Sequence, residues 1–254
     1  MAARQVPRRI GANVPVVPFD VEPHDGAEPV VIGGLQTSIL WRRSARARRI
    51  ALRIDPQGGR IVITLPPRGS RKAGLALLRG HEIWVAERLA ALPAPVIIAD
   101  GNEIPIFGRP HRIVHDPSLR GGAIIERAAI RIGGHPEFLA RRVRDALHDL
   151  ALRELSAQAR DKAAHVGARP AAIRVKDTRT RWGSCAANGT LMFSWRLIMA
   201  PSFVQDYVVA HEAAHLRHMN HGPDFWRLAE MLTPHRVAAT SWLAAEGPGL
   251  LRIS

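Results

Sequence analysis

The sequence predicts an α+β fold, in which a β-rich N-terminal half precedes a helical C-terminal half with a small sheet. Three observations lead to this prediction. Apolar residues alternate in short runs over the first half, as in Ile50, Leu52 and Ile54, which is the period of a half-buried strand. Glycine-rich turns such as Gly121-Gly122 separate these runs. From residue 136 onward, apolar residues recur at helical spacing over longer stretches.

Length and composition narrow the class of protein. The 254 residues fit one large domain or two small ones, and the 46% apolar share allows a sizeable core. No uncharged apolar run reaches the roughly 18 residues of a membrane span. Pro7, Pro15 and Pro18 interrupt the start of the chain, so no secretory signal and no membrane association are expected. The single cysteine, Cys185, excludes a disulfide framework, and we expect a soluble cytoplasmic protein.

The chain is strongly basic, with 36 Lys and Arg against 22 Asp and Glu and a formal net charge of +14. Such a charge can bind nucleic acid or another anionic surface. Only Lys72, Lys162 and Lys176 are lysines, however, and a genome rich in G and C produces an arginine-rich protein without selection for binding. Both interpretations of the charge remain open.

In the first half we expect a tail, two groups of strands and one helix. Residues 1–29 form a flexible N-terminal tail. A boundary at Gly133-Gly134 separates a β-rich region, 30–133, from a C-terminal region, 134–254, and no internal repeat is visible. A helix from Ser70 to about Leu92 lies between the strand groups. The expected strands are 30–32, 38–41, 50–54, 61–65, 96–99, 103–107, 111–115, 123–126 and 129–132.

The second half is expected to begin with a long helix over residues 136–165. A strand at 173–177, a loop at 178–189 and a strand at 190–195 follow. Another helix begins at Pro201 and ends near Met219, and one or two more helices fill residues 223–245.

One segment has a pattern with chemical meaning, His211-Glu212-Ala213-Ala214-His215. Residues four apart lie on the same face of a helix, so His211 and His215 can bind one metal ion between them. Three neutral imidazoles around Zn²⁺ leave a fourth position open, as a catalytic zinc requires. Glu212 is next along the helix and can accept a proton from water that the metal activates for attack on a carbonyl.

Two histidines compete as the third ligand. On a straight helix His218 lies on the metal face, but it lies seven residues past His211. That separation is about 10.5 Å along the axis, at 1.5 Å per residue. Both rings then cannot comfortably reach one ion at about 2.0 Å.

His221 is the alternative that we favour. If the helix ends near Asn220, the chain can turn back and bring His221 to the metal, and Gly222-Pro223 prevents continuation of the helix. Glu230 is a minor alternative from the next helix. The predicted metal ligands are His211, His215 and His221.

The tract VVAHEAAHLRHMNHGPDFW at residues 208–226 resembles the YgjP-like metallopeptidases, which are relatives of the SprT and WLM zinc peptidases. RWGSC at 181–185 and FSWRL at 193–197 add to this resemblance, which extends over about residues 30–245. It implies a zinc-dependent metalloendopeptidase acting on peptides or proteins, with the three histidines as ligands and Glu212 as the base. The SprT and WLM relatives suggest an alternative, a DNA-associated protease or a nucleic-acid-binding module.

The RWGSC segment lies in the loop before the strand at 190–195. A strand that borders a peptidase cleft often pairs with an extended substrate. We therefore predict Arg181, Trp182 and Trp195 as substrate-binding residues. A packing corner, with Trp182 buried and Gly183 in a turn, remains the alternative, and Ser194 stands where relatives usually have Asn.

Several other residues are interpreted as structural. A buried inert thiol is favoured for Cys185 over an inhibitory metal ligand. Packing is favoured for Tyr207 over donation to an oxyanion. His111 and His115 lie in a predicted strand, where residues four apart are about 13 Å from each other, so we assign them no metal.

The arginine cluster between Arg42 and Arg53 can follow a phosphate backbone, although a solvated strand face is favoured. Because alternate residues of a strand face opposite sides, Arg49 and Arg53 are expected to point outward together.

Overall fold

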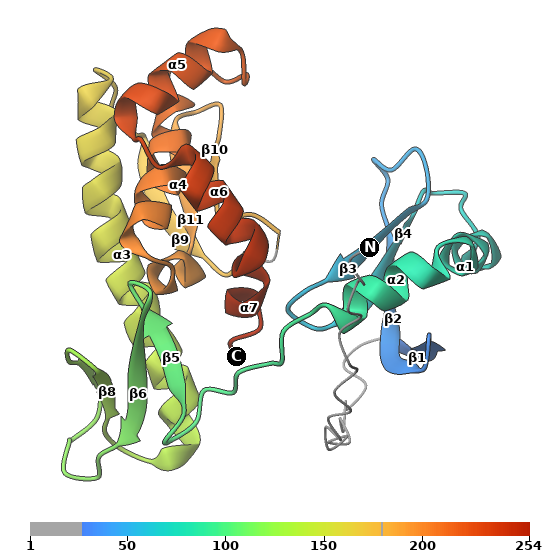
Figure 1. Cartoon of the computed structure of the whole chain (residues 1–254), viewed down its shortest axis with the longest axis horizontal. Helices are drawn as coiled ribbons and strands as arrows, with labels where there is room; N and C mark the ends of the chain where they lie inside the picture. Colours follow the sequence, from blue (N-terminus) through green and yellow to red (C-terminus); the bar gives the residue numbers. More distant parts are fainter. Residues whose placement is uncertain (1–26, 179) are drawn as a thin grey trace, which may run out of the picture.

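The computed structural model describes residues 27–178 and 180–254, which form two lobes joined by an extended linker (Figure 1). In the N-terminal lobe a sheet has the strand order β1-β2-β4-β3, with β2 parallel to β4 and the other neighbours antiparallel. Two helices pack on it through Leu78 and Val85. The elements are β1 (Ala27–Ile32), β2 (Leu35–Arg43), β3 (Ala51–Asp55), β4 (Arg60–Leu65), α1 (Arg71–Gly80) and α2 (Glu82–Ala90).

A second four-stranded sheet has the same arrangement. Its order is β5-β6-β8-β7, its central pair β6 and β8 is parallel, and a helix follows its last strand. The strands are β5 (Glu103–Ile106), β6 (Arg109–His115), β7 (Ala123–Ile125) and β8 (Ala129–Ile132). The fold therefore repeats one topology that the sequence does not reveal.

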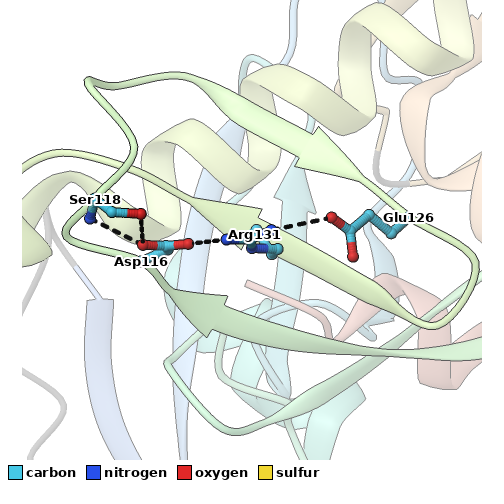
Figure 2. A network of polar contacts seen from close by, with 4 residues as sticks. All are labelled: Asp116, Ser118, Glu126 and Arg131. Carbon is cyan, nitrogen blue, oxygen red and sulfur yellow. Dashed lines mark hydrogen bonds and ion pairs between the residues drawn. The ribbon is translucent and has the colours of Figure 1, made fainter.

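A polar network joins three neighbouring strands of this second sheet, β6, β8 and β7 (Figure 2). The guanidinium of Arg131 on β8 pairs with Asp116, and its Nη1 lies 3.4 Å from Oε1 of Glu126. Asp116 also accepts hydrogen bonds from the backbone N–H and the hydroxyl of Ser118, at 2.9 and 2.6 Å. These contacts connect the strand ends to the turn between β6 and β7.

The rest of the C-terminal lobe is built on a 27-residue helix, α3 (Leu139–His165), which the short η1 (Pro136–Phe138) precedes. A third sheet has the order β10-β11-β9, so β10 is an edge strand. Lys162 of α3 joins two other helices, because its Nζ lies 2.6 Å from Oδ1 of Asp206 and donates to the carbonyl of Leu232 at 2.6 Å. The elements are β9 (Ala172–Lys176), β10 (Gly183–Cys185), β11 (Thr190–Ser194), η2 (Trp195–Met199), α4 (Ser202–Ala214), α5 (Pro223–Leu232), α6 (Arg236–Ala245) and α7 (Gly247–Leu251).

The α+β class is confirmed, but the buried residues divide at a different place from the predicted boundary. One cluster lies within the N-terminal lobe, and the main cluster joins the second sheet to α3, α4 and β11. Gly133 and Gly134 lie inside this main lobe. A Cβ on Gly133 would come within 2.4 Å of the Leu119 carbonyl oxygen, and Gly134 has φ +80, so the pair forms a tight turn.

Several predicted elements need correction. The helix expected from residue 70 is interrupted at His81, which has φ −124 and ψ 19 and follows Gly80, a poor helix former. Residues 96–99 form only an isolated bridge from Val96 to Ile253, and the loop at 178–189 contains β10.

The predicted tail overlaps β1 at residues 27–29, and its other residues, 1–26, lie outside the described residues. Within the described part of the chain, no helix combines the length and apolar character that crossing a membrane requires.

Candidate metal centre

The structure brings the three predicted ligands together at the end of α4. The candidate ligand atoms of His211, His215 and His221 all lie within 4.8 Å of one another, and Nε2 of His211 is 3.1 Å from Nε2 of His221. His221 reaches this position because α4 ends at Ala214, earlier than the predicted end near Met219.

Hydrogen bonding explains this early helix end and the role of His218. Nδ1 of His215 lies 2.9 Å from the carbonyl oxygen of His218. A carbonyl can only accept, so this Nδ1 carries the proton and leaves the lone pair on Nε2 of His215. His218 therefore contributes its backbone to the turn, and its side chain is outside the cluster.

The charge state of these rings suits a metal ion. Burial, and then the charges of His215, His221 and Arg236, lower the pKa of His211 to about 4. Burial also lowers the pKa of His215. The rings of His211 and His215 are thus neutral at pH 7. Converging imidazole lone pairs fit a transition-metal ion such as zinc.

Two aromatic residues at the start of α5 pack against the imidazoles. Phe225 is fully buried, and its ring centroid lies 4.9, 4.5 and 4.6 Å from those of His211, His215 and His221. The ring of Trp226 lies 5.6 Å from that of His221. These contacts restrain the rings. The sequence analysis missed this role, although both residues lie in the first turn of the helix that Gly222-Pro223 begins.

The side chain of Glu212 packs against β10. It is only 7% exposed, and a Cβ on Gly183 would lie 2.6 Å from its Cγ. Burial raises the pKa of Glu212 to about 7, and the positive charge of Arg181 acts in the opposite direction. The carboxyl group is therefore confined beside His211 and can take up or release a proton near neutral pH.

The three predicted substrate-binding residues have different surroundings. Arg181 is exposed and near enough to Glu212 to influence its pKa. Trp182 is half-buried, and its Cζ2 lies 3.2 Å from the position that a Cβ on Gly247 would occupy. Trp195 is only 4% exposed and belongs to the main core, so its side chain is enclosed by packing and is not available to a substrate.

The remaining predicted residues lie near or away from the centre as follows. Cys185 on β10 is half-buried, and burial, with the charge of Glu212, raises the pKa of its thiol, so it stays protonated. The ring of Tyr207 lies 5.9 Å from that of His211. His111 is buried beside the Arg109 carbonyl and belongs to no ligand cluster among the described residues.

Comparison with known families identifies the class as metallopeptidase. A family model described as YgjP-like, metallopeptidase domain, matches residues 48–246. This match spans most of the chain, and the protein belongs to the YgjP-like metallopeptidase family.

Among solved structures, one similar chain is the metallopeptidase zymogen abylysin of Pyrococcus abyssi. It shares 19% identity with a TM-score of 0.31, over 37% of this chain and 92% of that one. None of the curated proteins matches the chain.

Proposed function

We propose that this metallopeptidase is a zinc-dependent endopeptidase, with His211, His215 and His221 as metal ligands and Glu212 as general base. The observation that supports this proposal most is the convergence of three imidazoles next to a buried carboxyl group. Three protein ligands with a fourth position open are typical of catalytic rather than structural zinc.

Zinc bound here supplies a Lewis acid that lowers the pKa of water and polarises the scissile carbonyl. Glu212 accepts a proton from the attacking water at a carboxylate oxygen and delivers it to the nitrogen of the leaving amine. Its contact with Gly183 limits the orientations of the carboxylate. Phe225 excludes water from one side of the imidazoles, because it is fully buried against all three rings.

The edge strand β10 supports an extended peptide as substrate. It pairs with β11 on one side only, and the same strand holds Gly183 against Glu212. A peptide that adds to the open edge gains backbone hydrogen bonds and brings its carbonyls to the metal centre. Arg181 and Trp182, directly before this strand, then contact the substrate.

Glu212→Gln tests the proposed chemistry. The amide has nearly the same size but cannot accept the proton, so zinc content is expected to stay near one equivalent while cleavage of casein falls on the order of 10²–10⁴-fold. Glu154→Gln, on the exposed side of α3, serves as the matched control. Equal cleavage at equal zinc content would contradict the mechanism, and absence of a transition metal from chelator-free protein would contradict the site.

A DNA-associated protease is the second candidate, and one observation favours it. The side chains of Arg42, Arg43, Arg46, Arg48 and Arg49 are exposed on a segment without acidic residues. Arg53, expected to point outward with Arg49, is instead half-buried, with Nη1 buried. We further propose the cytoplasm as the compartment, because Cys185 is the one cysteine and is a free thiol.

A further inference from the structure

Arg236 at the start of α6 is held in place by two residues of α5. Its guanidinium carbon lies 3.6 Å from the centroid of the Trp226 ring, and its Nη1 lies 2.8 Å from Oε1 of Glu230. Trp226 and Glu230 are four residues apart, so one face of α5 provides both contacts. Stacking and ion pairing together restrict the guanidinium to a narrow range of positions.

This fixed cation lies beside the metal centre. The ring of Trp226, on which it stacks, is 5.9 Å from that of His211 and 5.6 Å from that of His221. The charge of Arg236 adds to the effect of burial on the pKa of His211, and it opposes the effect of burial on the pKa of Tyr207. A substrate bound at the metal therefore passes within reach of its field.

The guanidinium also borders an open groove of about 480 Å³ between α5 and α6. Thr233 is buried in the groove, whereas Val237 is 78% exposed at its edge. Nη1 of Arg236 donates a hydrogen bond to Glu230. Among the described residues, none forms a hydrogen bond with Nη2 or Nε of Arg236. The groove is lined by Glu230, Thr233, Pro234, Arg236, Val237 and Thr240.

We propose that this groove is a substrate subsite in which Arg236 binds a carboxylate of the peptide. The inference rests on the proposed peptidase function and specifies its substrate class: peptides with an acidic side chain or a free C-terminal carboxylate near the scissile bond. The remaining N–H groups of a planar guanidinium match the two oxygens of a carboxylate. A substrate amine is disfavoured, because Glu230 is already paired and Arg236 repels a second cation.

Three peptides of otherwise identical sequence separate the sources of the carboxylate. One has Glu beside the scissile bond and an amidated end, one has Gln and an amidated end, and one has Gln and a free C-terminus. We measure kcat/KM with the zinc-loaded protein and Kd with the zinc-loaded Glu212→Gln variant. At least one carboxylate peptide is expected to be favoured over the neutral one by about tenfold, the scale of a charge-assisted hydrogen bond.

Variants then assign this preference to Arg236. Arg236→Gln is expected to bring the ratio between carboxylate and neutral peptides close to one, in both kcat/KM and Kd. Glu230→Gln is expected to increase the ratio, because it removes the competing carboxylate. Arg227→Gln is the matched control, since this arginine of α5 is exposed and pairs with Asp224.

The possible outcomes distinguish this inference from the proposed function. A preference for the Glu peptide or for the free C-terminus supports the subsite and identifies the source. Equal values for all three peptides, or a preference that persists in Arg236→Gln and is unchanged in Glu230→Gln, overturn it. If the zinc-loaded protein cleaves no peptide, the peptidase proposal fails, while the Kd values still test the subsite.

Discussion

Gly183 of β10 and Glu212 of α4 are packed so closely that a side chain on the glycine would collide with the carboxylate. A Cβ at this position would lie 2.6 Å from Cγ and 2.7 Å from Oε1 of Glu212. The φ angle of Gly183 lies outside the left-handed range. Glycine is therefore required here because Glu212 approaches so closely, and not because of a turn. The glycine of the RWGSC segment is thereby connected to the proposed base.

Gly183→Ala is therefore expected to displace Glu212 without disturbing the histidines. Peptidase activity should fall on the order of 10²-fold, the lower end of a general-base contribution, because the carboxylate no longer reaches the attacking water. Zinc content should remain that of the parent. Gly249→Ala is the control, since its Cβ would meet only Pro93, at 3.8 Å. Full activity of Gly183→Ala would show that the base tolerates displacement.

The third metal ligand is tested by a pair of alanine substitutions. His221→Ala should lose most of the zinc affinity, because its Nε2 faces that of His211. His218→Ala should retain it, because only the carbonyl of His218 takes part in the turn, and alanine keeps that carbonyl. Competition with a chelating dye measures both affinities. The reverse order would mean that His218 is the ligand.

The network around Asp116 predicts a pH dependence of stability. The Ser118 hydroxyl and the Arg131 guanidinium lower the pKa of Asp116 from 3.8 to about 2. A depressed pKa contributes stability above the unfolded value, and this contribution is lost as the pH falls toward the folded value. Asp116→Asn should therefore unfold at lower urea concentration than the parent at pH 7, and the difference should shrink between about pH 4 and pH 2.

The control for this experiment is Asp145→Asn, an exposed position on α3. The urea concentration at the midpoint of its unfolding should equal that of the parent protein at every pH. A constant difference between Asp116→Asn and the parent down to pH 2 would mean that the charge of Asp116 contributes nothing.

The nucleic-acid alternative makes a separate prediction. Replacing exposed Arg48 and Arg49 by Ser should weaken duplex DNA binding and flatten its dependence on salt. With fewer phosphate contacts, fewer counterions are released from the DNA on binding. Arg53→Ser is a useful comparison, since that side chain is half-buried. Fluorescence anisotropy at low salt measures binding, and zinc content should not change. Absence of binding by the parent protein would remove this alternative.

Local patterns predicted most strands and the positions of His211 and His215, because alternation and helical spacing depend on neighbours in the chain. His221 was predicted from the helix-ending Gly222-Pro223, although α4 ends even earlier. The sequence could not show that Arg236 stacks on Trp226, since that contact depends on how α6 packs against α5. For the same reason the burial of Trp195, which the core around α3 determines, was not foreseen.

Lys162 restrains the two helices that carry the metal centre, although it lies far from the histidines. Its ammonium holds Asp206 near the beginning of α4 and the carbonyl of Leu232 at the end of α5. His211 lies near the other end of α4, and Phe225 lies near the other end of α5. Lys162 therefore joins the two helices at the ends far from the metal centre. An ion bound by the proposed ligands would connect the end of α4 to the turn before α5. Loading with metal should then stiffen the helical lobe as a whole rather than only the loop around His221.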